Sequence, residues 1–228
     1  MSDLQEIKIG STKIIALRDG ELNIPKEILC NLDEDLSNKI SEENSQLTLN
    51  NVNAYLIVKG ARTLLVDTGC RDLFGPTCGF VHDEIKKANV KPEDITDIFF
   101  THLHPDHIAG AIDKNGKAMF PNAMVKVLGI ELNFWSKDDF DDVEINGKNF
   151  ADLSKTVIKA YDNKIETLTS QQEIIPGVYP VALPGHTPGH AGFRVDDDDD
   201  SFEYIVLLYE LHIVSESIHY RKFFITIF

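Results

Sequence analysis

The sequence predicts an α/β fold in which strand-like and helix-like segments alternate along a single domain, residues 1–228. Two further observations agree with this prediction. The chain has 228 residues and 43% of them are hydrophobic, so it can bury a core without a disulfide scaffold. It also has no short-period internal repeat, which argues against a solenoid or propeller.

The first half of the chain predicts three strands, at 13–17, 53–58 and 62–67. The last two are separated only by Lys59-Gly60-Ala61, as the strands of a hairpin would be. The polar segment 33–50 before them is expected to be a surface excursion.

The second half predicts alternating helices and strands. Helical patterns cover 82–89 and 148–161, and β-branched or aromatic runs cover 95–101, 124–128 and 178–183. Strand-like runs at 191–195 and 202–208 flank the five aspartates 196–200. Like charges in a row favour a solvated turn there, because a calcium site would need a spaced, glycine-containing loop.

Charge and cysteine content narrow the function classes. The chain has 22 Lys and Arg against 37 Asp and Glu, a formal charge of −15, which disfavours binding to nucleic acid or anionic membranes. Cys30, Cys70 and Cys78 fit no zinc or redox spacing and indicate reduced thiols. With neither a secretion signal nor an 18-residue apolar run, the sequence leads us to expect a cytoplasmic protein.

Residues 101–107, Thr-His-Leu-His-Pro-Asp-His, concentrate side chains that can bind metal. His102 and His104 follow a predicted strand, where residues two apart point to the same side, so both imidazoles can reach one ion. The proline that follows keeps His104 out of the helical region. Asp106 then opens a helix and, with His107, is directed at a second position beside the first.

Two other segments are expected near this loop. His186 lies in a Gly- and Pro-containing loop after a strand and could complete the ligand set of the first ion, while His190 is expected behind it or in packing. Asp67 ends an apolar strand at the same expected sheet edge. It is either an outer acceptor that holds the ligand loop or a simple turn residue. Trp135 suits core packing or a pocket wall.

These motifs resemble those of the metallo-β-lactamase superfamily, whose hallmark is the H-x-H-x-D-H loop. The resemblance covers about residues 10–195. The flanking motifs Val66-Asp67-Thr68-Gly69 and Pro184-Gly185-His186-Thr187 match in the same order. Segments 67–77, 120–123 and 134–135 resemble the branch that contains methyl parathion hydrolase and lactonase-like enzymes.

The resemblance implies an αββα sandwich, with its last elements incomplete here, and two divalent metals at one edge of the sheets. Zinc is the expected metal, with iron or manganese as alternatives. The first ion would be bound by His102, His104 and His186, and the second by Asp106 and His107. Asp67, Thr187 and His190 would lie behind these ligands.

The sequence departs from the family pattern after residue 208. The family's bridging aspartate has no match, and Glu210 is the nearby carboxylate that could replace it. The final histidine has no secure match either, although His212 and His219 are conceivable substitutes. The divergent end, 209–228, suggests a truncated product with a second ion that is weakly held or absent.

The apolar segment 223–228 should be paired, because an unpaired strand of this composition would aggregate. Its partner is either the chain's own sheet or a second copy in a homodimer.

The expected function is therefore a metal-dependent hydrolase that uses a metal-held hydroxide on an ester-like bond, in a lactone, aryl ester or phosphotriester. Asp106 would bind the second ion and also transfer a proton. Neutral small molecules are the expected substrates. Two alternatives remain: a catalytically impaired metal-binding remnant, and an iron-dependent redox member of the same superfamily.

Overall fold

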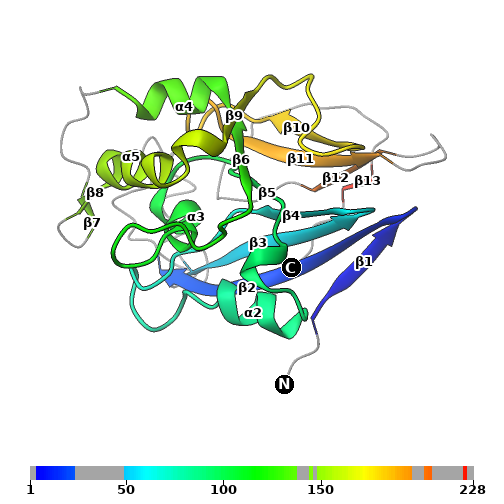
Figure 1. Ribbon diagram of the computed structural model, residues 1–228, viewed down its shortest axis with the longest axis horizontal. Helices are drawn as coiled ribbons and strands as arrows, with labels where there is room; N and C mark the ends of the chain where they lie inside the picture. The colour runs from blue at the N-terminus through cyan, green and yellow to red at the C-terminus, as the bar shows by residue number, and fades with distance from the viewer. Residues whose placement is uncertain are drawn as a thin grey trace, which may run out of the picture.

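A computed structural model of the chain describes residues 4–23, 49–137, 144–145, 148–196, 203–206 and 223–224. Its strands form a seven-stranded sheet in the order β1-β2-β3-β4-β5-β6-β9 and a four-stranded sheet in the order β10-β11-β12-β13 (Figure 1). The larger sheet contains β1 (Glu6–Ile9), β2 (Thr12–Asn23), β3 (Leu49–Lys59), β4 (Arg62–Val66), β5 (Asp97–Phe99), β6 (Met124–Leu128) and β9 (Ile165–Leu168). The smaller contains β10 (Val178–Ala182), β11 (Ala191–Asp196), β12 (Glu203–Val206) and β13 (Phe223–Phe224), and β7 (Glu144–Ile145) pairs with β8 (Lys148–Asn149).

The helices are short and lie on the larger sheet or at its end (Figure 1). They are α2 (Val81–Lys87), α3 (Pro105–Ile108), α4 (Gly129–Trp135) and α5 (Phe150–Ala160), with 3₁₀ turns at Pro92–Asp94, Ala109–Ala111 and Asp162–Lys164. Asn149 caps α5, because its side chain accepts hydrogen bonds from two backbone N–H groups of the first turn. No helix in the described part of the chain has the length and apolar character needed to cross a membrane.

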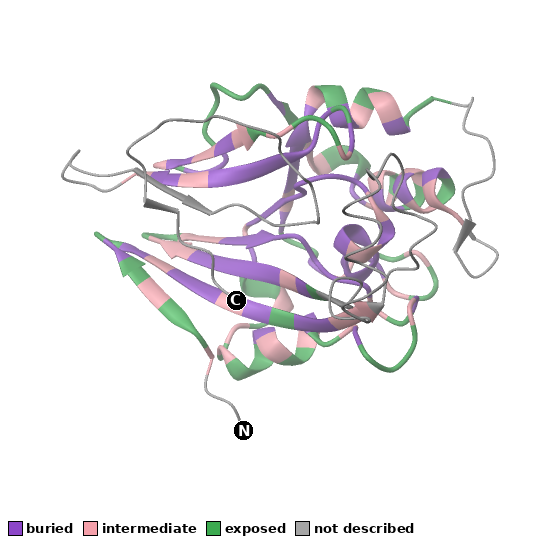
Figure 2. Cartoon of the chain, turned by 180° about the vertical axis from the view of Figure 1, so that it is seen from behind, coloured by how far each residue is buried: buried purple, intermediate pink, exposed green. Residues whose placement is uncertain are grey.

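Alternation along the strands of the larger sheet divides the apolar side chains between two cores. Leu65 packs on the helix side with residues of α2 and α5, whereas Leu64 and Val66 pack against the smaller sheet, where they meet Phe193 of β11. Successive residues of a strand face opposite sides, so one strand serves both cores. Figure 2 shows buried residues along the strands of both sheets and exposed residues on the outer faces of the helices. The layers are therefore helix, sheet and sheet.

The parallel part of the larger sheet fixes where a site can form. β4, β5 and β6 are parallel neighbours, so their carboxyl ends meet at one edge. Asp67 follows β4, the loop 100–104 follows β5, and α4 follows β6. The loop between β10 and β11 reaches the same edge, because the Ala191 N–H donates to the Thr101 carbonyl at 2.9 Å.

The predicted α/β class is confirmed, and so are most of its elements. The strand at 124–128 has the predicted bounds, and the other predicted strands and helices in the described residues are confirmed with shifted ends. Strand β5 is shorter than predicted at both ends, because a 3₁₀ turn capped by Ile95 precedes it and the ligand loop follows it. Strands β1 and β9 and helix α4 were not predicted. The excursion predicted at 33–50 lies outside the described residues, except for positions 49 and 50, which belong to β3.

The smaller sheet contains part of the divergent end. Strand β12 lies within the predicted strand 202–208, and β13 pairs with it in parallel, so Phe223 and Phe224 find their ladder partner in the same chain. Asp196 ends β11. Residues 197–200 of the predicted acidic turn lie outside the described residues.

Candidate metal centre

Three of the predicted ligands converge on one point. Nε2 of His102 lies 3.1 Å from Nδ1 of His104 and 3.1 Å from Nε2 of His186, and the His104 and His186 nitrogens are 2.7 Å apart. Ligands of one tetrahedral zinc ion, each at about 2.1 Å, would lie roughly 3.4 Å from one another. The triangle of nitrogens is therefore close to the size that a single ion requires.

Hydrogen bonding alone does not account for this triangle. A ring nitrogen of a neutral imidazole either donates or accepts, and a protonated ring only donates. Three nitrogens in mutual contact must include two with the same role, so at least one of the three contacts is not a hydrogen bond. A cation that accepts all three lone pairs resolves the conflict, and the donor set fits a metal.

The loop geometry that presents these imidazoles follows from local sequence. His104 is extended, with φ −76° and ψ 152°, as predicted. Helix α3 begins at Pro105, one residue before the predicted start at Asp106, because proline suits the first position of a helix. Asp106 and His107 then follow in the first turn of the helix. The His107 ring lies 4.1 Å, centroid to centroid, from the ring of His102. Its Nε2 is 3.3 Å from Oδ2 of Asp106.

His107 lies between two carboxylates. Its Nδ1 is 2.7 Å from Oδ2 of Asp67, on the opposite side of the ring from Asp106. Burial lowers the pKa of His107, but the negative charges of Asp106 and Asp67 outweigh burial and raise it well above its ordinary value. The surroundings thus favour positive charge here, which a proton or a metal cation can supply.

Asp67 holds the start of the ligand loop through hydrogen bonds with Thr101. It is buried, and its oxygens accept hydrogen bonds from the N–H of Thr101 at 2.9 Å and from the Thr101 hydroxyl at 2.7 Å. The hydroxyl oxygen then accepts from Nδ1 of His102 at 3.2 Å. This chain of contacts places the ring proton of His102 on Nδ1 and leaves the Nε2 lone pair directed at the triangle. Thr101 had no predicted role, although its position just before the motif was visible.

Glu131 is a further site residue that the sequence analysis did not predict. It is fully buried in the first turn of α4. One oxygen accepts from the Leu103 N–H at 3.0 Å and the Trp135 indole N–H at 2.7 Å. The other accepts from the Thr187 hydroxyl at 2.6 Å and the Gly189 N–H at 3.0 Å. No motif marks Glu131, because three of its four donors are distant in sequence and only Trp135 lies on the same helix.

Aromatic rings surround the triangle. Trp135 and Phe150 meet the His104 ring edge to face, with centroids 5.4 and 5.7 Å away. Trp135 is buried in the core, as predicted, and its edge also lines an open groove between α4 and α5 that none of the predicted metal ligands lines. His190 is buried, with its ring 4.9 Å from that of His102 and 5.6 Å from that of His186.

A second group of possible ligands lies apart from the histidines. Asp19, Cys70 and Cys78 have donor atoms within 4.8 Å of one another. The Asp19 oxygens accept the N–H groups of Cys70 and Val81, which accounts for that carboxylate's burial. Both cysteines are free, and burial is the main cause that raises the pKa of each thiol, so they remain protonated at neutral pH.

The remaining predicted positions divide into two groups. Thr187 is buried behind the His186 loop, where it donates to Glu131. Glu210, His212 and His219 lie outside the described residues, so the predicted replacements for the bridging carboxylate and the final histidine stay predictions.

The chain belongs to the metallo-beta-lactamase superfamily, whose family model matches residues 47–202. This range spans β3 to β11, the second strand of the smaller sheet, and includes every predicted ligand except Glu210 and the possible substitutes His212 and His219. The family and fold predicted from the H-x-H-x-D-H loop are therefore confirmed.

Similar proteins include lactonases. An N-acyl homoserine lactonase of a Bacillus species is 26% identical over 165 residues, 63% of this chain and 58% of the relative. The chain thus spans less than two thirds of that relative. The dizinc quorum-quenching lactonase AidC is 26% identical, with a TM-score of 0.74 over 89% of this chain and 74% of AidC. The hydrolase AbOPH has the same fold, with a TM-score of 0.74, 24% identity and coverage of 90% and 73%.

Proposed function

We propose that this chain is a metal-dependent hydrolase of ester-like bonds, with lactones as the first substrate class to test. The observation that carries the proposal is the triangle of three imidazole nitrogens, 2.7 to 3.1 Å apart, at the carboxyl edge of the parallel strands. The similarity of the chain to two proteins described as N-acyl homoserine lactonases favours lactones over aryl esters and phosphotriesters as substrates.

The residues that would hold the metal form two sets. His102, His104 and His186 would bind the first ion, while Asp106 and His107 would contribute to the second, with Glu210 as a further ligand. We propose zinc, because AidC is described as a dizinc enzyme. When bound, divalent cations at such a site activate water and polarise the carbonyl or phosphoryl oxygen of the substrate.

The chain's own groups orient the ligands and move protons. The hydrogen bonds from Thr101 to Asp67 and from His102 to Thr101 fix the tautomer in which Nε2 of His102 is free to bind. The carboxylate of Asp106 retains 22% exposure, unlike the buried Asp67, so it can take up a proton and release it to solvent. We therefore propose Asp106 as the proton-transferring group.

The acidic surface favours an uncharged substrate. A net charge of −15 repels anions from the protein as a whole, whereas a neutral lactone or ester is not repelled. We propose neutral small molecules as substrates, and on the same ground we propose that nucleic acids and anionic membranes are not partners.

The decisive experiment joins metal analysis with a substrate panel. The purified chain is assayed for bound zinc, iron and manganese, and then for hydrolysis of a lactone, an aryl ester and a phosphotriester. A His102→Ala, His104→Ala double variant is the control. We expect about one tightly bound zinc, a partly filled second site, and lactone hydrolysis that the double variant loses.

The other outcomes distinguish the alternatives. Tightly bound metal without turnover of any substrate would indicate a metal-binding remnant. Iron as the native metal would favour the redox alternative. Equal turnover by the wild type and the double variant would overturn the proposal.

A further inference from the structure

We infer that Glu131 is a positioning residue that sets the separation of His104 and His186 and thereby the affinity of the first metal site. This inference rests on the proposed function, because it concerns the same metal centre. The predicted ligands come from two segments more than 80 residues apart in sequence, and the Glu131 carboxylate contacts both of them.

Each carboxylate oxygen of Glu131 holds a different ligand segment. Oε1 accepts from the N–H of Leu103, the residue between His102 and His104. Oε2 accepts from the Thr187 hydroxyl and the Gly189 N–H, and these two residues lie one and three positions after His186. The two ligand segments are therefore joined through one rigid planar carboxylate.

The packing around Glu131 leaves little room for another arrangement. A Cβ on Gly189 would lie 2.3 Å from the Glu131 backbone nitrogen, so the His186 loop approaches α4 backbone to backbone. On the other side, the Leu103 carbonyl accepts from the Ser154 hydroxyl of α5 at 2.9 Å. Leu103 is thus held at both its N–H and its carbonyl, and the carboxylate cannot shift without moving a ligand loop.

The hydrogen-bond pattern calls for a carboxylate in particular. Four donors and no acceptor face the two oxygens among the contacts of the described residues. An amide offers one acceptor oxygen and an N–H₂ group. In Glu131→Gln the Thr187 hydroxyl can reverse and accept, but the Gly189 N–H loses its acceptor, so the His186 side of the bridge weakens.

The test measures metal affinity in folded protein rather than activity. Metal-free wild type, Glu131→Gln and Glu131→Leu are titrated with zinc against a competing chelator. The cobalt(II) forms are compared by visible absorption, which reports ligand geometry. We expect zinc affinity to fall by about 10- to 100-fold in Glu131→Leu, with an altered cobalt spectrum, and by less in Glu131→Gln.

Two controls separate positioning from stability. Asp97→Asn changes another fully buried carboxylate, which pairs with Arg62 and Lys126 away from the ligand loops, so it should lower the melting temperature but leave zinc affinity within twofold. Thr187→Val and Thr187→Ser form a matched pair, and only the valine should weaken zinc binding, because serine keeps the hydroxyl that donates to Glu131.

The results that would overturn this inference differ from those that would overturn the proposed function. Unchanged zinc affinity and an unchanged cobalt spectrum in Glu131→Leu would overturn this inference and leave the proposed function standing. Equal losses of affinity in Glu131→Leu and Asp97→Asn would assign Glu131 a role in stability only. Wild-type protein that binds no metal would overturn both proposals.

Discussion

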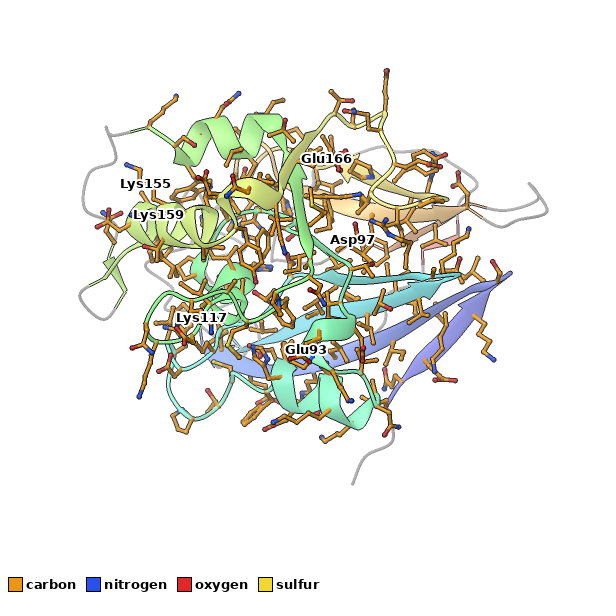
Figure 3. All side chains as sticks on the ribbon, in the orientation of Figure 1. Glu93, Asp97, Lys117, Lys155, Lys159 and Glu166 are labelled. Atoms are coloured by element: carbon orange, nitrogen blue, oxygen red, sulfur yellow. The ribbon has the colours of Figure 1, made fainter. Side chains whose placement is uncertain are left out.

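The carboxylates at the two ends of the parallel strands have their negative charge compensated in different ways. Asp97, at the start of β5, is fully buried between cations of the chain: Arg62 Nε donates to it at 2.8 Å, and Lys126 Nζ lies 3.3 Å away. Lys126 also reaches Glu166, which is 3.6 Å away on the neighbouring strand β9. Asp97 and Glu166, both labelled in Figure 3, thus belong to the two strands that flank β6 in the sheet order.

At the other end of the same strands, the described part of the chain gives Asp67 and Glu131 no such partners. Among the described residues, the contacts of Asp67 and Glu131 come from backbone N–H, hydroxyl, indole and imidazole groups, with no lysine or arginine. A buried anion needs compensation. Asp97 is compensated by Arg62 and Lys126 of the chain itself, so this group contributes to stability. The carboxylates beside the histidines can instead be compensated by a cation from solution.

The sharpest contrast within the metal centre is between His186 and His190. Removing one of three ligands of an ion costs much of its affinity, so His186→Ala should lower zinc affinity by about 1000-fold, or roughly 4 kcal/mol. The ring of His190 is nearby but lies outside the triangle of contacting nitrogens, so His190→Ala should cost about tenfold or less. Chelator competition measures both. Similar losses in the two variants would mean that the ligand set is assigned wrongly.

Substitutions in the Asp97 group, which comprises Asp97, Arg62, Lys126 and Glu166, should change the stability of the protein and leave its zinc affinity unchanged. Lys126→Met removes one cation beside a fully buried carboxylate, and we expect the free energy of unfolding to fall by about 2–3 kcal/mol while zinc affinity stays unchanged. Glu166→Gln is the matched control, because this carboxylate is 47% exposed and its pair with Lys126 contributes little. Denaturant unfolding of the metal-free protein tests both. A loss of zinc affinity in Lys126→Met would show that the two groups are coupled.

The smallest expected effect concerns the hydrogen bonds beneath the ligand loop. In Asp67, one oxygen accepts from the Thr101 N–H, and the other contacts the Thr101 hydroxyl and His107. In Asp67→Asn an N–H₂ group replaces one of these oxygens, so at least one donor loses its acceptor. We expect a fall in zinc affinity of about tenfold, less than for the loss of a ligand. Isothermal titration with zinc can measure it. If the zinc affinity of Asp67→Asn equals that of the wild type, Asp67 is a simple turn residue and does not hold the ligand loop.

Local sequence determined the parts of this protein that depend on neighbours in the chain. The β-prone apolar run Leu64-Leu65-Val66 specifies a strand, and Pro105 keeps His104 extended before α3. The H-x-H-x-D-H spacing brings His102 and His104 to the same side because both lie on one extended segment. These features were predicted because each follows from interactions over a few residues.

Only the tertiary structure decided what joins distant segments. His186 meets His104 because β10 and β11 form a second sheet whose connecting loop reaches the edge where β5 ends. The role of Glu131 depends on four donors from three separate parts of the chain, and only one of them, the Trp135 indole, is a neighbour of Glu131 in sequence. The physical reason is that a buried carboxylate is specified by the donors that surround it, and those donors are assembled only when the sheets pack.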